Sequence, residues 1–422
     1  MKPVPAQAQR IPELDGIRGI AILLVIGSHY EVFARQIGGL PRFGWVGVDI
    51  FFVLSGFLIT SVLLKLRGRD DSFKVFYSRR FRRILPPYII AVALIYLLSA
   101  LQGDHALYNF REVVRNALFL QSFQVHQTFS AFHHSSQQMW RLAHSPLPSS
   151  ARGLTGDIAD ARAVLWSLSI EEYFYLLWAP AVLWMKRKWL AITGIIICLA
   201  AFTFRWLAFI GTNSYFSVLH RFDALIFGSF VALLLSSKVP QRALNAILIG
   251  AGCFGAASFA AVLLPMGNVL NKEVREDHVF ITSGLVALSL MTASAVGLAA
   301  AKSGSRFLFF LRSPALRFIG AISYSLYLFH GLTYLCFIQF FQPTWQVSLT
   351  ALGCAFGMSV LSWHYVELPI LNGGRYGGKS VMMSTDVSSS SSEDIHSASG
   401  EVLPKSPSVP ALAQFQDATR EP

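Results

Sequence analysis

The segment RGIAILLVIGSH, residues 18–29, places ten residues, nearly all apolar, between an arginine and a histidine. Similar apolar runs recur along the 422-residue chain, of which 54% is hydrophobic and only 14% is charged. A soluble globular domain carries roughly 25% charged residues, so this chain is expected to bury most of its surface in lipid. The sequence therefore predicts an all-α, polytopic integral membrane bundle.

Ten of these runs approach the length of about 20 residues that an α-helix needs to cross the hydrocarbon core of a bilayer. They cover about residues 14–35, 45–66, 85–101, 165–185, 190–210, 217–235, 243–264, 281–300, 316–340 and 346–370. The first run is expected to be retained rather than cleaved, because Pro12, Glu13 and Asp15 stand where a signal peptide would carry basic residues.

Basic residues are concentrated after the even-numbered runs. The segment 67–83 holds seven Lys or Arg, and further basic groups follow at 186–188, at Lys238 with Arg242, and at 301–317. Short cytoplasmic loops of membrane proteins carry an excess of Lys and Arg. The pattern predicts ten transmembrane helices with both termini in the cytoplasm. It also explains much of the net charge of +12, so no nucleic-acid partner is needed.

Composition divides the chain into three parts. Residues 1–13 are predicted to be a cytoplasmic segment, 14–371 the membrane domain, and 372–422 a disordered, Ser-rich cytoplasmic tail. The membrane domain contains an enlarged external loop at 102–164, whose histidines are irregularly spaced and lack nearby carboxylates. The four cysteines lie singly in apolar runs, without metal-ligand spacing. We therefore predict no metal site.

Polar residues inside the apolar runs carry the functional prediction, because ionisable groups in a membrane are costly unless they are paired or hydrated. His29 follows Arg18 by eleven positions, which is about 16 Å along a helix and close to three turns. The two side chains should therefore lie on nearly the same helix face, with Arg18 at the cytoplasmic end. Other polar groups are expected to converge on this helix: Asp49, Ser55, Glu171, Arg221, Asp223, Tyr324, Tyr327, His330, His364 and Glu367.

The Arg–His spacing and six further motifs resemble the acyltransferase family 3 membrane proteins, which transfer acyl groups from acyl-CoA to sugars and other exported molecules. The motifs are GVDIFFVLSGFLI, RRFRRILPPY, WSLSIEEYFY, RFDALIFGS, SYSLYLFH and WHYVELP. The resemblance covers about residues 11–371. The chain departs from the family in its enlarged loop and in the lack of a fused extracytoplasmic hydrolase-like domain, so we expect the membrane domain to complete its reaction alone.

The resemblance implies roles for individual residues. It implies catalytic roles for His29, Glu171 and Arg18. It implies acyl-CoA binding by Arg18, Arg79, Arg80, Arg82, Arg83, Ser55, Gly56 and Phe57. It implies acceptor binding by Asp49, Arg221, Asp223, Tyr324 and His330. The expected donor is acyl-CoA, with acetyl-CoA favoured by family habit. The expected acceptor is a glycan or glycolipid, and the expected location is the bacterial cytoplasmic membrane.

The chemistry of these side chains fits such a reaction. Arginine recognises phosphate through a planar fork of donors, which suits the cytoplasmic CoA. An ordinary histidine titrates near neutral pH and can act as general base toward an acceptor hydroxyl, with Glu171 orienting it. We expect direct transfer without a covalent acyl-enzyme, because Ser55, the best-placed nucleophile, is also typical of a small residue at a helix contact.

Simpler roles remain open for several residues. Arg18 could anchor a helix at the lipid headgroups, His29 could join two helices, and Asp49 with Arg221 could form a structural ion pair. A transporter or flippase of a glycan or lipid precursor is the alternative function, although such proteins usually show internal repeats with broken helices, and no repeat is visible. A noncatalytic sensor would not need a histidine paired at depth with an acidic residue. Release of CoA in the presence of acceptor would separate the enzyme from the transporter.

Overall fold

The computed structural model describes residues 11–30, 40–101, 110–120, 164–207, 218–266, 277–342 and 344–373. The regular structure of these residues is entirely helical, which confirms the predicted all-α class. The α-helices are α1 (Pro12–His29), α3 (Val46–Leu66), α4 (Ser72–Leu101), α5 (Phe110–Ala117), α8 (Trp166–Trp184), α9 (Arg187–Leu207), α10 (Val218–Leu235), α11 (Gln241–Leu263), α12 (Leu285–Ala301), α13 (Pro314–Phe340), α14 (Trp345–Ser362) and α15 (Leu368–Gly373). Two π-helical turns are η11 (Phe280–Gly284) and η13 (Trp363–Glu367), and three 3-10 turns are η1 (Leu40–Trp45), η8 (Leu264–Met266) and η12 (Arg306–Arg312).

The chain divides into two compact units, Met1–Gly377 and Gly378–Pro422. The second unit lies outside the described residues, as does most of the predicted segment 1–13, of the loop 102–164 and of the tail 372–422. The helices and fold described below all belong to the first unit.

Helices occupy all ten predicted apolar runs, and seven of them are long and apolar enough to cross a membrane. The seven are Phe43–Leu66, Ser72–Leu98, Arg187–Leu207, Gln241–Met266, Phe280–Ala301, Pro314–Ile338 and Trp345–Leu371. The other three, α1, α8 and α10, carry many of the charged and polar residues of the predicted site. Ten spans with both termini inside therefore stay a prediction.

Helix α4 begins earlier than the sequence indicated. The segment 67–83 is predicted as a loop, yet residues from Ser72 onward are helical, so that the basic cluster 79–83 lies on α4 itself. Pro86 and Pro87 lie inside this helix rather than at its start. Proline lacks the N–H that would donate to the carbonyl four residues back. Near these prolines, the Tyr324 hydroxyl of α13 donates to the Ile84 carbonyl of α4 at 3.0 Å and so joins the two helices.

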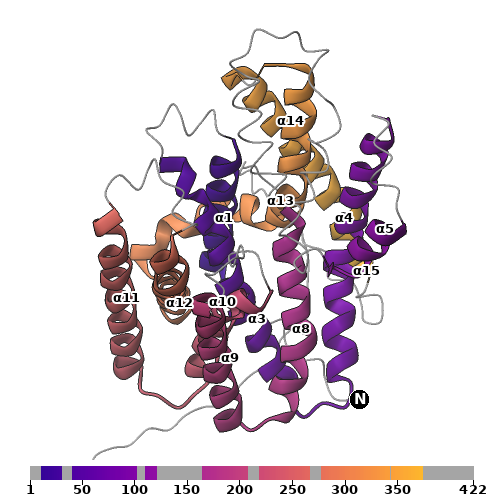
Figure 1. Cartoon of the computed structure of the whole chain (residues 1–422). Helices are drawn as coiled ribbons and strands as arrows, with labels where there is room; N and C mark the ends of the chain where they lie inside the picture. The colour runs from indigo at the N-terminus through magenta and orange to yellow at the C-terminus, as the bar shows by residue number, and fades with distance from the viewer. Residues whose placement is uncertain are drawn as a thin grey trace, which may run out of the picture. The chain divides into compact units, whose positions relative to one another are not determined.

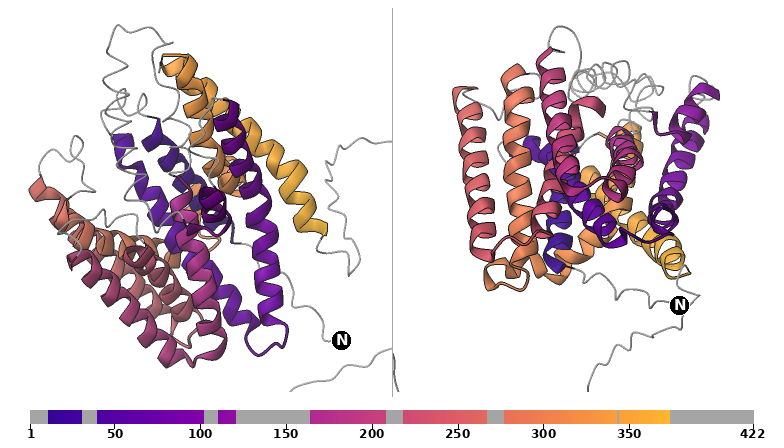
Figure 2. Two further views of the ribbon diagram at one scale, coloured as in Figure 1. Left: turned by 45° about the vertical axis from the view of Figure 1, so that its right-hand side comes forward. Right: turned by 90° about the horizontal axis from the view of Figure 1, so that it is seen from below.

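Helix α1 packs between α13 and α3, and α10 lies against α3 (Figures 1 and 2). The first turn of α1 contains Pro12 together with the acidic residues Glu13 and Asp15, which suit a helix N-terminus. The contact with α13 is backbone against backbone, since a Cβ on Gly19 or on Gly320 would collide with a main-chain carbonyl of the other helix. Glycine at these positions therefore fixes how closely α1 and α13 approach.

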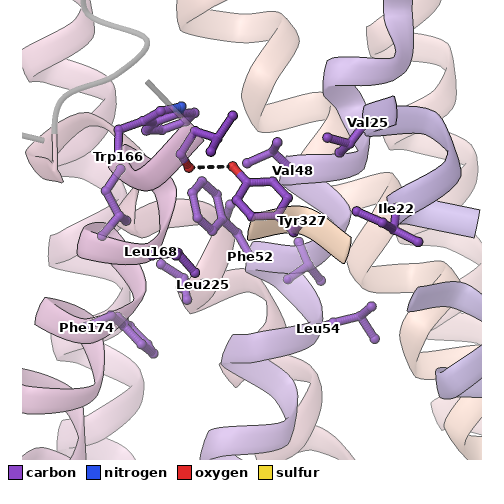
Figure 3. Packing of buried hydrophobic residues seen from close by; sticks show 14 of the residues in the cluster. Ile22, Val25, Val48, Phe52, Leu54, Trp166, Leu168, Phe174, Leu225 and Tyr327 are labelled. Carbon is purple, nitrogen blue, oxygen red and sulfur yellow. Dashed lines mark hydrogen bonds between the residues drawn. The ribbon is translucent and has the colours of Figure 1, made fainter. Parts of the chain in front are cut away.

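The interior beside α1 is filled by large apolar side chains from α3, α8 and α13 (Figure 3). The rings of Phe52 and Trp166 meet edge to face with centroids 6.0 Å apart. Tyr327 reaches across from α13 and donates its hydroxyl to the Val164 carbonyl at 2.9 Å, while the Ser167 hydroxyl lies 2.7 Å away. Tyr327 thus joins α13 to the start of α8 and belongs to the packing of the bundle.

Candidate active site

Arg18 lies about two turns inside the N-terminal end of α1 (Pro12–His29), and His29 is the last residue of the helix. The Arg18 side chain is 19% exposed, and its guanidinium lies 3.6 Å from the Asp15 carboxylate one turn earlier. Residues 31–35 of the predicted apolar run lie outside the described residues. The helix therefore places a cation and an imidazole at two separate levels of the bundle.

The surroundings of His29 define which ring nitrogen can act as a base. Nδ1 of His29 lies 2.8 Å from the Val25 carbonyl, which can only accept a hydrogen bond. In the neutral imidazole Nδ1 must therefore carry the proton, which leaves the lone pair on Nε2. The Ser28 hydroxyl donates to the same carbonyl at 2.8 Å. Nε2 is therefore the nitrogen of His29 that can act as a general base.

His330 of α13 is the ring that meets His29. The two centroids lie 5.0 Å apart with an interplanar angle of 71°. His330 is buried, and its Nδ1 lies 2.7 Å from the Tyr327 carbonyl, so it too holds its proton on Nδ1. The structure thus brings His330 beside the predicted base, whereas Tyr324 contacts α4 through the Ile84 carbonyl.

Glu171 contacts residues other than His29. Its Oε1 accepts from the Ser55 hydroxyl at 2.8 Å, and its Oε2 accepts from the Tyr175 hydroxyl at 2.6 Å. Its electrostatic neighbours are Arg18 and Arg80, at the other end of α1 from His29. The orientation of His29 by Glu171 therefore stays a prediction, because both carboxylate oxygens are used at the Arg18 end.

The two residues after Ser55, also assigned to donor binding, belong to the packing of α3. A Cβ on Gly56 would collide with the Leu225 carbonyl, so this position sets the approach of α10 to α3. Phe57 is buried in the apolar core. Of the three, only Ser55 presents a polar group to the site.

The four arginines of the basic cluster on α4 separate into two pairs. Arg80 and Arg83 are half-buried, whereas Arg79 and Arg82 are exposed. The members of each pair are three residues apart and so share a helix face. Among the described residues, Arg80 and Arg83 interact electrostatically with Arg18, and donor binding by Arg79 and Arg82 stays a prediction.

Aromatic rings, rather than carboxylates, hold Arg80 in position. Its guanidinium carbon lies 5.3 Å from the centroid of the Tyr175 ring and 6.0 Å from that of Phe76. In the described part of the chain, neither Arg80 nor Arg83 forms an ion pair with a carboxylate. Together with Arg18 they make a three-arginine cluster whose charges repel one another. Such a cluster favours a polyanionic ligand.

The predicted acceptor residues Asp49, Arg221 and Asp223 form buried ion pairs. Arg221 pairs with Asp49, and Arg205 of α9 pairs with Asp223 at 2.7 Å. All four side chains are at most 2% exposed. A structural ion pair between Asp49 and Arg221 is the simpler role that the sequence left open, and this pair joins α3 to α10.

A comparison of the chain with models of protein families covers the residues described above. The model of a family described as an acyltransferase domain matches residues 11–366, which include the whole of the arrangement above. The chain belongs to this acyltransferase family.

Relatives of this acyltransferase chain include enzymes of bacterial cell walls. It is 28% identical over 386 residues to the peptidoglycan O-acetyltransferase OatA of Listeria monocytogenes, covering 86% of this chain and 56% of that protein. It is 25% identical to the O-acetyltransferase OatA of Staphylococcus aureus, covering 86% of this chain and 58% of that protein. The chain thus spans little more than half the length of these relatives. No solved structure matches it.

Three residues of this acyltransferase site escaped the sequence-based assignment. Tyr175 lies within the WSLSIEEYFY motif but resembles an ordinary packing aromatic, and its contacts with Glu171 and Arg80 depend on the fold. Arg205 sits in an apolar helix, where an unexplained buried charge is itself a signal. Ser325, within SYSLYLFH, donates to the Glu367 carboxylate. Among the described residues, no group of three or more His, Cys, Asp or Glu is placed to hold a metal ion.

Proposed function

We propose that this protein is a multi-pass O-acyltransferase of the bacterial cytoplasmic membrane. It moves an acyl group, acetyl in the simplest case, from cytoplasmic acyl-CoA to a hydroxyl of an exported or surface glycan. Family membership supports acyl transfer, and the names of the relatives support an O-acetyl product and peptidoglycan as the first acceptor to test. The observation that carries the proposal is the three-arginine cluster beside the N-terminal half of α1, with His29 at the C-terminal end of the same helix.

The cluster of Arg18, Arg80 and Arg83 supports a CoA site. The phosphates of CoA are the kind of polyanion that clustered guanidinium groups recognise. His29 follows Arg18 by eleven positions on α1, about 16 Å along the helix axis, which approximates the reach of an extended pantetheine arm. The thioester would then lie near His29 while the phosphates remain with the arginines.

His29 supplies the base in this scheme. Its Nε2 takes the proton of the acceptor hydroxyl while the hydroxyl oxygen attacks the thioester carbonyl. A C–O bond forms, the C–S bond breaks, and CoA leaves as the thiolate. Transfer is direct, so both substrates are bound together. Glu171 balances the charge of Arg18 and Arg80, and its action on His29 remains part of the proposal.

The test uses the purified full chain in liposomes with radiolabelled acetyl-CoA and soluble glycan fragments of peptidoglycan. We expect CoA release that depends on the fragments, together with label in the glycan. Labelled glycan without dependence on His29 would overturn the mechanism. Movement of glycan across the liposome without CoA release would overturn the enzyme and favour the transporter.

A further inference from the structure

The helix that ends the described part of the chain is interrupted by the π-helical turn Trp363–Glu367, between α14 and α15. The N–H of Leu368 bonds to the Trp363 carbonyl five residues back, instead of four as in an α-helix. One extra residue in a turn shifts all later side chains by about 100° around the axis. The turn leaves His364 exposed and Glu367 only 1% exposed.

Glu367 is a buried carboxylate fixed by two serines. Oε1 of Glu367 accepts a hydrogen bond from the Ser325 hydroxyl of α13 and another from the Ser362 hydroxyl at 3.4 Å. The serine hydroxyls themselves lie 3.1 Å apart. Burial of a carboxylate is costly unless hydrogen bonds and an opposite charge compensate it. The serines supply the hydrogen bonds but no charge.

Arg83 supplies the opposite charge. Helix α4 packs against both η13 and α15, and Arg83 is the charged side chain among the described residues that interacts electrostatically with Glu367. The two do not form a close ion pair, so the Arg83 guanidinium keeps its donors available. The attraction of Glu367 thus offsets part of the repulsion that Arg18 and Arg80 exert on Arg83.

We infer that Glu367 is a positioning residue for the donor site: the π-helical turn and its two serines fix a buried carboxylate that holds Arg83 in the three-arginine cluster. The inference rests on the proposed binding of acyl-CoA by that cluster. It assigns the Ser325–Glu367–Ser362 network a role in donor affinity and none in the chemical step.

The experiment is a double-mutant cycle on the purified full chain, with binding of CoA itself and turnover of acetyl-CoA as the readouts. For Glu367→Gln we expect the Kd of CoA and the KM of acetyl-CoA to rise about tenfold, and kcat to stay within about twofold. Arg83→Gln should raise the same constants, and adding Glu367→Gln to it should raise them little further. The matched control is His364→Ala on the same turn, which should change neither constant.

Ser325→Ala provides a second route if Glu367→Gln does not fold, because it keeps the carboxylate but removes its hydrogen-bond donor. It should raise the Kd of CoA by a smaller factor. Unchanged CoA affinity in a folded Glu367→Gln or Ser325→Ala protein, or additive effects with Arg83→Gln, would overturn the inference while leaving the proposed function intact. A wild-type protein that binds no CoA would overturn both.

Discussion

The rings of His29 and His330 meet edge to face, 5.0 Å apart, each holding its Nδ1 proton toward a carbonyl of its own helix. The arrangement leaves Nε2 of His29 as the basic nitrogen. We therefore expect His29→Ala to lower kcat by about two to four orders of magnitude, because the general base is lost. Turnover of acetyl-CoA by the purified variant measures this, with thermal unfolding as the check on folding. Near-normal turnover would remove His29 from the mechanism.

The two faces of α4 should differ in their effect on the donor. Loss of Arg80 or Arg83 should raise the KM of acetyl-CoA about 10- to 100-fold, since each removes charge-assisted hydrogen bonds to phosphate. Arg79→Ala and Arg82→Ala change exposed side chains and should raise it by less than about twofold. Equal effects from both pairs would show that the cluster acts through overall charge rather than through a site.

Glu171→Gln should reduce turnover partially, because the amide keeps a hydrogen bond to Ser55 but loses the charge beside Arg18 and Arg80. The companion variant Tyr175→Phe removes one hydrogen bond to Glu171 and keeps the ring against Arg80. We expect it to lose less activity than Glu171→Gln. A complete loss in Glu171→Gln, equal to that of His29→Ala, would instead indicate a proton-accepting role.

Direct transfer predicts no covalent intermediate. Because its hydroxyl donates a hydrogen bond to Glu171, Ser55 is the described side chain best placed to act as a nucleophile and form an acyl-enzyme. Incubation with radiolabelled acetyl-CoA and no acceptor should leave the denatured protein unlabelled, and the kinetics should be sequential. Stoichiometric label that acceptor removes would contradict direct transfer, and its loss in Ser55→Ala would identify the residue.

The Asp49–Arg221 pair is predicted to act on stability. Asp49→Asn leaves a buried guanidinium without its carboxylate, which typically costs about 3–5 kcal/mol. We expect a clear fall in thermal stability with little change in the KM of the acceptor for the protein that remains folded. A raised acceptor KM at unchanged stability would return Asp49 to the acceptor site.

The predicted topology can be tested with reporter fusions. Fusions after residues 75 and 378 should report the cytoplasm, and a fusion after residue 130 should report the outside, because basic loops are retained inside. Residue 75 is decisive because it lies at the start of α4, next to the basic cluster. An external signal there would invert the proposed locations of donor and acceptor.

Among the described residues, apolar runs located the long helices because such runs are long and uniform, and their signal does not depend on contacts. Glu171 shows the limit of this approach. The depth expected for Glu171 rested on the assumption that α8 begins where its apolar run begins. Its partner Tyr175 lies four residues later on the same helix, but its partner Ser55 depends on how α3 and α8 pack.

Irregular helix starts and turns were the second feature that the sequence did not predict. The start of α4 at Ser72 extends a helix through charged residues that apolar periodicity cannot follow. The π-helical turn before Glu367 adds one residue to a turn without any marker in composition, so the inward direction of that carboxylate depended on the three-dimensional packing.

The glycine contacts between α1 and α13 also bear on how material crosses the membrane. A transporter that alternates its access must slide or rock one group of helices against another. Gly19 and Gly320 let the two backbones meet, and a Cβ at either position would collide with a main-chain carbonyl of the other helix. A larger side chain at either glycine would therefore push α1 away from α13 and displace Arg18 and His29 together, so that in the proposed mechanism this contact fixes the helix and the flexible arm of the donor is the part that moves.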